Sequence, residues 1–433
     1  MDFSKRKTEL LKAFSRRLVE AIKASAPDIP RIEAEGIPGP RSASIILYAG
    51  TANGKLLTLL SAHQCAFPRS LVPWPFNSIQ VYMQGPGVKV EVPWPPELQE
   101  TYYPLTSLLH LKPAGVAWIW GVSETGKIVC ATLKDHSPHW LVAGTTGSGK
   151  TTALLAAIYQ LCQTPNVRLV LLDGKGGVSF EPLKKIPNLL GPVVSDLYSA
   201  YNALSYVVAE LRRRYKLLSQ GIIKGWPAIV VIVDEFQEFT SAPSISRLLR
   251  EIAASGRAAH IHLILSSQHP NIKMFGDWGA EIKRNLPGRL VLRVLDADAS
   301  RVAVGGPYPR ADLLLGLGDA YIITSTALRI QVPFVSIEDF KALGESEPEL
   351  RDWPEAGSPF DSTEAMEIAA AIRAVLRGKG RPWATKEIAK LGLNPPGAEK
   401  GIRLMQMARD ILEELKKQGY TIASEGGNGH GGA

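Results

Sequence analysis

Residues 139–152 read His-Trp-Leu-Val-Ala-Gly-Thr-Thr-Gly-Ser-Gly-Lys-Thr-Thr, and this stretch decides the fold of the chain. The apolar run at 140–143 has the composition of a buried strand, and the Ala/Leu-rich run at 153–162 suits a helix. Between them lies the pattern GxxxxGK[ST], whose glycines allow backbone N–H groups to wrap a chain of phosphates. Strand, glycine loop and helix in this order predict a P-loop and an α/β nucleotide-binding domain.

Each residue type in this loop has a task in holding a nucleotide. Lys150 supplies positive charge to the β- and γ-phosphates, Thr151 offers a hydroxyl to Mg²⁺, and the helix N-terminus adds partial positive charge. ATP and Mg²⁺ are therefore the predicted cofactors. The predicted nucleotide-binding residues are Gly144, Thr145, Thr146, Gly147, Ser148, Gly149, Lys150, Thr151, Thr152 and Asp234.

Length and composition limit the class of protein. At 433 residues the chain is long enough for two or three domains, and 45% hydrophobic with 21% charged residues is a globular balance. The net charge of +8 is compatible with a polyanionic partner. Three cysteines without CxxC spacing predict a reduced protein with neither a disulfide framework nor a zinc site. No apolar run reaches the ~18 residues of a membrane span, so we expect a cytoplasmic protein that reaches a membrane only through a partner or a surface helix.

The first 115 residues are expected to form a small α+β domain. Residues 2–24 have helical apolar spacing and many basic residues; we expect the apolar stripe to pack on its own domain, although a membrane or DNA surface would also suit it. Segments 43–48, 55–60 and 78–83 look like strands. Nothing here resembles a catalytic motif, which favours a collar, an oligomerisation surface or a partner-binding surface.

Residues 116–336 are predicted to form a RecA-like P-loop ATPase core built on a parallel sheet. Apolar runs of strand length alternate with helical stretches such as 198–220, and this alternation places ligands at the carboxyl ends of the strands. The predicted strands are 141–143, 168–172, 229–233, 262–265, 290–294 and 320–323.

The C-terminal part is predicted to be a helical module. Residues 337–362 form an acidic linker, residues 363–424 a domain of three helices and a strand, and residues 425–433 a disordered tail. The order fits a winged helix-turn-helix, and a plain helical bundle fits it as well. In the DNA-binding alternative, Lys400, Arg403 and Arg409 would face nucleic acid.

An Asp-Glu pair after an apolar strand indicates hydrolysis. Asp234 is placed to hold Mg²⁺ through water, and Glu235 can polarise the water that attacks the γ-phosphate. Gln268, just past the next strand, is a candidate γ-phosphate sensor, and Arg257 could reach a neighbour's nucleotide; an ordinary loop glutamine and a surface arginine are the alternatives. His260 and His262 have no further ligand at metal spacing, so we reject a metal site there. The basic run 212–216 is expected to be a solvated helix end rather than a binding patch.

Together these motifs resemble the FtsK/SpoIIIE family of DNA translocases. The likeness covers about 121–335 in specific motifs and extends loosely to that family's smaller α domain over 36–109. Residues 173–175 read Asp-Gly-Lys where the family has Asp-Pro-Lys. The matching segments are 138–152, 173–175, 186–196, 210–216, 233–236, 256–263, 267–270, 285–289, 300–301 and 315–320.

The resemblance implies a homo-hexameric ring that threads double-stranded DNA and binds ATP between subunits. It implies that Arg257 acts in trans, that Gln268 senses the γ-phosphate and that His262 is structural. The stretch between 220 and 228 is shorter than the family's usual insertion, which contributes to a pore loop. Segment 271–283 would then carry more of the DNA contact, and the candidates are Lys273, Lys283 and Arg284.

The sequence thus predicts an ATP-hydrolysing double-stranded DNA translocase that moves plasmid, mobile-element or chromosomal DNA, as in conjugative transfer. Two alternatives keep the ATPase and change the cargo: a single-stranded DNA helicase or coupling ATPase, and a protein-secretion ATPase. A third alternative is an ATP-bound scaffold with incidental turnover. The intact Lys150, Asp234 and Glu235 argue against the scaffold.

Overall fold

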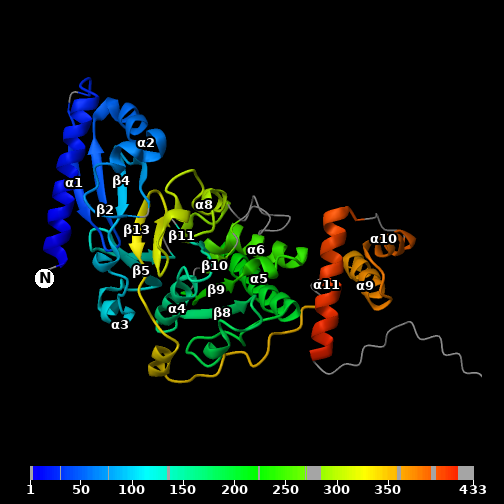
Figure 1. Ribbon diagram of the computed structural model, residues 1–433. Helices are drawn as coiled ribbons and strands as arrows, with labels where there is room; N and C mark the ends of the chain where they lie inside the picture. The colour runs from blue at the N-terminus through cyan, green and yellow to red at the C-terminus, as the bar shows by residue number, and fades with distance from the viewer. Residues whose placement is uncertain are drawn as a thin grey trace, which may run out of the picture.

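A computed structural model describes residues 3–29, 31–76, 78–133, 137–222, 225–268, 270, 284–357, 362–391 and 396–417. Along the chain they form an N-terminal antiparallel sheet with helices, a large central sheet with helices on its faces, and a group of three C-terminal helices (Figure 1).

The N-terminal domain is a four-stranded antiparallel sheet in the order β1-β2-β4-β3. Its helices α1 and α2 and the inward faces of its strands share one hydrophobic cluster. On β4 the valines at 88, 90 and 92 belong to that cluster, so Lys89 and Glu91 point to the opposite face of the sheet. The elements are α1 (Phe3–Ser25), β1 (Glu33–Pro38), β2 (Ser42–Tyr48), α2 (Asn53–Arg69), β3 (Gln80–Gln84), β4 (Gly87–Pro93) and α3 (Leu105–Leu108).

The expectations for this domain can be compared with the structure directly, and the strands expected at 43–48 and 78–83 are present as β2 and β3. The apolar stripe of α1, with Phe14 and Leu18 fully buried, packs on its own domain as expected. The strand predicted at 55–60 is wrong, because these residues lie inside α2. Leu56 and Leu60 are buried four residues apart, which is the helical period, and the segment contains a single β-branched residue.

The central sheet has nine strands among the described residues, in the order β6-β5-β13-β12-β11-β7-β10-β9-β8. All six strands predicted for the core are present, with ends shifted by up to two residues. The strands are β5 (Ala117–Ser123), β6 (Ile128–Thr132), β7 (Trp140–Ala143), β8 (Val167–Asp173), β9 (Ala228–Asp234), β10 (Ile261–Ser267), β11 (Gly288–Leu292), β12 (Asp319–Ile323) and β13 (Ala327–Gln331).

The predicted parallel sheet accounts for five of the nine described strands, and the other four are antiparallel. Strands β11, β7, β10, β9 and β8 are parallel, whereas β12, β13, β5 and β6 pair antiparallel. The reason lies in the connections: only Thr324–Thr326 separates β12 from β13, and a parallel pair needs a crossover of about a dozen residues or more.

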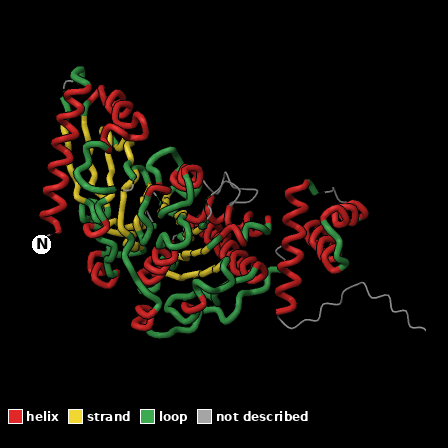
Figure 2. The backbone as a smooth tube through the Cα atoms, viewed as in Figure 1, coloured by secondary structure: helices red, strands yellow, loops and turns green. Residues whose placement is uncertain are grey.

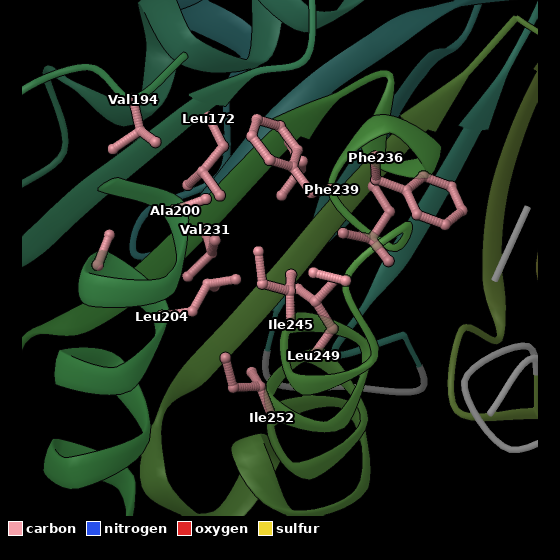
Figure 3. Packing of buried hydrophobic residues seen from close by; sticks show 14 of the residues in the cluster. Leu172, Val194, Ala200, Leu204, Val231, Phe236, Phe239, Ile245, Leu249 and Ile252 are labelled. Atoms are coloured by element: carbon pink, nitrogen blue, oxygen red, sulfur yellow. The ribbon is translucent and has the colours of Figure 1, made fainter. Parts of the chain in front are cut away.

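Helices cover both faces of the parallel half, as the tube in Figure 2 shows. Helices α5 (Leu197–Ser219) and α6 (Pro243–Ser255) pack on one face, where Leu204 and Ile245 meet Leu172 and Val231 of the strands (Figure 3). Helix α4 (Lys150–Leu161) lies in the cluster on the other face. Because both faces are covered, the strands read as continuous apolar runs, which is why the sequence revealed them.

The segment after β13 lies against the core before it reaches the C-terminal helices, running beneath the central sheet in Figure 1. Backbone N–H groups of Glu349 and Leu350 donate to Leu189 and Leu190, and the Trp353 indole N–H donates to the Pro192 carbonyl at 2.9 Å. The segment that we expected to link two domains is thus attached to the edge of the sheet beyond β8.

The C-terminal helices are α9 (Ser362–Leu376), α10 (Arg381–Lys390) and α11 (Ala398–Lys417). A further short helix, α8 (Ala297–Val304), lies between β11 and β12 in the central domain. The three predicted helices are confirmed. The predicted strand at 420–422 and the tail at 425–433 lie outside the described residues. Among the helices that are described, none combines the length and the hydropathy needed to cross a membrane.

Candidate nucleotide site

Four neighbouring parallel strands bring the predicted site residues to one edge of the sheet. The P-loop follows β7, Ser266 to Gln268 end β10, Asp234 ends β9 and Asp173 ends β8. Because parallel strands run the same way, all four carboxyl ends meet at this edge. The structure therefore brings together residues that the sequence separates by more than a hundred positions.

The glycines of the P-loop are required by its backbone and its close packing. Gly147 and Gly149 have φ of 75° and 102°, values that L-residues rarely adopt. A Cβ on Gly149 would lie 2.6 Å from the Gly318 nitrogen, and one on Gly144 would lie 2.6 Å from the Ser148 hydroxyl oxygen. Gly147 and Gly149 are thus required by their backbone conformation, and Gly144 and Gly149 also by close packing against their neighbours.

Lys150 is buried, with 3% of its side chain exposed, and points at the carboxylates of the Asp-Glu pair. Its Nζ donates to Asp234 Oδ1, to Glu235 Oε1 at 2.7 Å and to Ser266 Oγ at 3.1 Å. A buried ammonium needs such partners because an unpaired charge in the interior is costly. The lysine predicted to bind phosphate thus contacts both the predicted Mg²⁺ ligand, Asp234, and the predicted general base, Glu235.

The carboxylates are also held by neutral donors. Ser179 Oγ donates to Asp234 Oδ2 at 3.0 Å, and Gln237 Nε2 donates to Glu235 Oε2 at 2.6 Å. Burial alone would raise the pKa of both acids, but the charge and hydrogen bond of Lys150 outweigh it, and the pKa of each is lowered. Both groups are therefore carboxylates at neutral pH.

Glu235 sits in a left-handed backbone conformation, with φ 48° and ψ 54°. This conformation is unusual for a residue with a long side chain and marks a position that its surroundings enforce. The Gln268 backbone N–H donates to Glu235 Oε2 at 2.9 Å, and the Gln268 side chain accepts from the Thr146 hydroxyl at 3.2 Å. The predicted sensor therefore touches both the P-loop and the predicted base.

Asp173 and Lys175 complete this edge of the site. The Asp173 carboxylate accepts backbone N–H bonds from Lys175, Ser179 and Phe180, which closes the loop after β8. Lys175 lies 3.6 Å from Asp234 Oδ2 and 3.4 Å from Glu235 Oε1. Residue 174 packs so closely that a Cβ there would lie 2.6 Å from the Glu235 carbonyl oxygen. The family likeness singled out 173–175, but not the contact of Lys175 with the Asp-Glu pair.

A pocket of about 360 Å³ opens beside the P-loop and was not expected from the sequence. Tyr102 and Phe334 line it with ring centroids 5.4 Å apart, and Leu317 adds an apolar side chain that is 66% exposed. Gly147, Gly149 and Thr152 form its P-loop side. Exposed aromatic faces next to a phosphate cradle suit a nucleobase and its ribose. No spacing signal could have revealed it, because Tyr102 and Phe334 come from distant loops.

The residues present fit a magnesium nucleotide. The loop that contains Gly144, Gly147 and Gly149 leads into the N-terminus of α4, which adds favourable partial charge for phosphate. The Thr151 hydroxyl and the Asp234 carboxylate are hard oxygen donors of the kind that Mg²⁺ prefers.

Arg257 lies at the other edge of the sheet. It is exposed in the short turn Gly256–Ala259 that precedes β10, whereas Gln268 follows the carboxyl end of the same strand. Seven residues at about 3.3 Å each separate the two edges by ~20 Å, so Arg257 cannot reach the P-loop of its own chain. It lines a cavity of about 620 Å³ together with Tyr215, His260 and His262.

His262 and one arginine of the basic run, Arg214, are buried, whereas Arg212 and Arg213 lie at the surface. The His262 ring nitrogen Nδ1 lies 2.9 Å from the Pro138 carbonyl oxygen, and burial lowers its pKa to about 4. Of the arginines expected to be a solvated helix end, Arg212 and Arg213 pair at the surface with Glu251 and Glu210. For Arg214 the expected solvation is wrong, because its side chain is 3% exposed. It donates to the Pro227 carbonyl before β9 and to the Ala259 carbonyl before β10.

The DNA-contact candidates are only partly described. Lys273 and Lys283 lie outside the described residues, and Arg284 is exposed. In the C-terminal helices Arg409 is exposed and Arg403 partly so, whereas Lys400 bonds to the buried carboxylate of Glu367 at 2.7 Å. Lys400 therefore ties α11 to α9 within the module.

Sequence comparison finds relatives for most of the chain. Residues 116–226 match the model of the FtsK/SpoIIIE family. A DNA translocase FtsK from Pseudomonas putida is 33% identical over 371 residues, which cover 70% of this chain and 43% of that protein. A protein of the same name from Shewanella oneidensis is 29% identical over 466 residues, covering 93% of this chain and 48% of that protein. The chain thus spans less than half the length of these relatives.

A solved structure with a similar fold is that of the pCW3 conjugation coupling protein TcpA, in its monomer form with ATPgS. It matches with a TM-score of 0.53 at 19% sequence identity, over 76% of this chain and 99% of that one. At this identity the likeness concerns the fold, which is a mixed α/β P-loop core with a sheet rich in parallel strands.

Proposed function

The chain belongs to the FtsK/SpoIIIE family of ATPases, and on this premise we propose that it hydrolyses ATP to move along double-stranded DNA. The observation that carries the proposed ATP hydrolysis is the buried contact of Lys150 with Asp234 and Glu235 beside the P-loop, whereas the proposed DNA track rests on the relatives. A structural ion pair would need neither the glycine cradle nor the adjoining pocket.

Nucleotide binding would redistribute these contacts. Lys150 would exchange its carboxylate partners for the β- and γ-phosphates, which removes the positive charge that lowers the pKa of Glu235. Glu235 would then be a stronger base toward the attacking water, since a base works best when its pKa approaches the working pH. Gln268, which already contacts Thr146 and Glu235, would report on the γ-phosphate. Mg²⁺, held by Thr151 and through water by Asp234, would neutralise phosphate charge.

The proposed cargo is duplex DNA of plasmid, mobile-element or chromosomal origin. Relatives named DNA translocase and a net charge of +8 support a polyanionic track. Contacts to phosphates are independent of sequence and weaken with salt, as a motor that passes over any sequence requires. Lys273, Lys283 and Arg284 remain the proposed pore contacts, and the C-terminal helices the proposed winged-helix module.

The working unit is proposed to be a homo-hexameric ring of RecA-like cores. Arg257 supports this, because it lies ~20 Å from the P-loop of its own chain and would meet a nucleotide only across a subunit boundary. There it would stabilise the charge that develops on the transferred phosphoryl group.

The deciding experiment measures steady-state ATP hydrolysis with duplex DNA, with single-stranded DNA and without polymer, using Lys150→Ala as the blank. We expect strong stimulation by duplex at moderate salt and loss of the stimulation at high salt. Preference for single strands would instead indicate a helicase-like coupling ATPase. Turnover that no nucleic acid changes would overturn the DNA proposal and favour a protein cargo or a scaffold.

A mixing experiment tests the ring. Lys150→Ala and Arg257→Ala should each be inactive alone, and a mixture should recover part of the wild-type rate. The recovery would come from sites that combine an intact P-loop with a neighbour's intact arginine. If the mixture stays as inactive as the separate variants, Arg257 does not act in trans.

A further inference from the structure

A second buried charge cluster lies between the N-terminal domain and the central sheet. Glu91 of β4 contacts Arg329 of β13 at 3.3 Å and Lys89 at 2.8 Å, and the guanidinium of Arg329 also donates to both carboxylate oxygens of Asp319, at 2.9 and 2.7 Å. All four side chains are at most 4% exposed. The cluster therefore connects a residue of the N-terminal domain to the first residue of β12.

Asp319 ends a tight loop that is held against the P-loop. Gly316, Leu317 and Gly318 all have positive φ, of 77°, 53° and 86°, so three consecutive residues adopt left-handed conformations. The Asp319 carboxylate accepts from the Leu315 N–H at 2.8 Å, which fixes this loop from inside. We call residues 315–319 the clamp loop.

The clamp loop determines how the P-loop peptides are turned. The Gly318 N–H donates to the Ser148 carbonyl at 2.7 Å. In a planar trans peptide the C=O and the next N–H point in opposite directions, so this bond turns the Gly149 N–H away from the clamp loop. A P-loop binds phosphate with backbone N–H groups of this kind. The hydrogen bond to the Ser148 carbonyl therefore fixes the direction of the Gly149 N–H, which belongs to the same peptide unit.

A second connection reaches the same loop from the N-terminal domain. Arg41, 4% exposed, donates to Gln331 Oε1 at 3.0 Å, and Gln331 Nε2 donates to the Leu317 carbonyl at 2.8 Å. The Val332 N–H adds a bond to the Gly318 carbonyl at 2.8 Å. Two chains of buried contacts thus run from one domain to one loop.

We propose that the N-terminal domain holds the P-loop in its nucleotide-binding conformation, with Glu91 and Arg41 as positioning residues that act through Arg329, Asp319 and Gln331. The inference rests on the proposed nucleotide site and adds a domain to it that contributes no phosphate contact. Loosening either chain frees the clamp loop, and the P-loop donors then lose their fixed orientation before the nucleotide arrives.

The matched pair of variants is Glu91→Gln and Glu124→Gln in the full-length chain. Both glutamates are buried and both pair with Lys89, but Glu91 contacts Arg329 and Glu124 bonds to Ser44 instead. Equilibrium titration with a fluorescent ATPγS analogue gives the dissociation constant, at a temperature where melting curves show both variants folded. We expect Glu91→Gln to weaken binding about tenfold and Glu124→Gln to leave it within twofold of wild type.

Kinetics and exchange separate positioning from a general loss of stability. Glu91→Gln should raise KM for ATP with kcat nearly unchanged, and should speed amide exchange in the 144–152 peptide without nucleotide. Equal dissociation constants for wild type and Glu91→Gln would overturn the inference. If Glu91→Gln does not fold, Arg41→Met decides by the same criteria, because it removes the hydrogen bond to Gln331 and leaves the contacts of Arg329 with Asp319 and Glu91 in place. A wild type that does not bind the analogue would instead refute the proposed nucleotide site.

Discussion

Two buried lysines in this protein each sit between two carboxylates, and they differ in what completes the cluster. Lys89 meets Glu91 and Glu124, with Arg329 and Asp319 beside them, so every charge in this cluster has a buried partner of opposite charge. Lys150 meets Asp234 and Glu235, with the partly exposed Lys175 farther away and an open pocket on the P-loop side.

In the Lys89 cluster, burial and pairing shift the pKa values in opposite directions, and for Glu124 burial prevails and raises the pKa. Burial would lower the pKa of Lys89, but Glu124 and Glu91 outweigh burial and raise it, while the pKa of Glu91 falls because Lys89 and Arg329 outweigh its own burial. A lysine between two carboxylates thus forms a closed structural contact at Lys89. At Lys150 the same arrangement forms contacts that a phosphate chain can replace.

The largest expected effect separates the two lysines by stability. Lys89→Met leaves Glu124 buried without its cation and Glu91 with Arg329 alone, and should lower the free energy of unfolding by about 3–5 kcal/mol. Lys150→Met should cost less, because a second cation, Lys175, stays within 3.6 Å of both of its former partners, yet it should abolish ATP hydrolysis. Urea unfolding and steady-state hydrolysis measure the pair. Equal stability losses would contradict the distinction between a closed and an exchangeable cluster.

Glu235→Gln probes the exchangeable cluster alone. Hydrolysis should fall by roughly 10²–10⁴-fold, because an amide cannot accept the proton of the attacking water. Nucleotide binding should persist, since Lys150 and the glycine cradle remain. Single-turnover hydrolysis and analogue titration check both points, with Gln237→Ala as a control that removes one donor to Glu235 but keeps the carboxylate. Full turnover in Glu235→Gln would refute its assignment as the base.

Two buried histidines make the free energy of unfolding depend on pH. Burial lowers the pKa of His139 to about 3 and that of His262 to about 4, below the ordinary value near 6.5. As pH falls through ~6.5 the unfolded chain takes up protons while the folded chain does not, so stability is lost toward acid, by about 1.2 kcal/mol per histidine between pH 6 and 5. Unfolding of wild type and His262→Asn across this range tests the sign. Parallel pH curves for the two proteins would show that His262 contributes nothing.

Lys175→Ala should have the smallest effect on stability. Its ammonium lies 3.4 Å or more from the carboxylates and its side chain is 29% exposed, which places it among the weak ion pairs of about 1 kcal/mol or less. A thermal melt should shift by a few degrees at most. A loss of stability as large as that of Lys89→Met would contradict this expectation. It would mean that the Lys150 cluster depends on Lys175 as strongly as the Lys89 cluster depends on Arg329.

Local patterns fixed much of the site in advance. The glycine loop, the Asp-Glu pair after β9 and Gln268 after β10 are each written within a few residues, and parallel strands carry them to a common edge. The strands themselves were visible because both of their faces are apolar. Segment 55–60 misled us because leucines at helical spacing also suit a short strand when read over six residues.

The amino-acid sequence by itself determined the α/β core, its P-loop and the acidic pair, because these depend on local spacing and on the buried faces of single strands. Only the tertiary structure decided what faces the outer side of β4. The alternation of valine with Lys89 and Glu91 predicts a solvated face, whereas the central sheet covers it and Arg329 makes its charges tolerable. The pocket at Tyr102 and Phe334 and the anchoring of Ser148 by Gly318 arise in the same way, since they join residues whose distance along the chain carries no periodic signal.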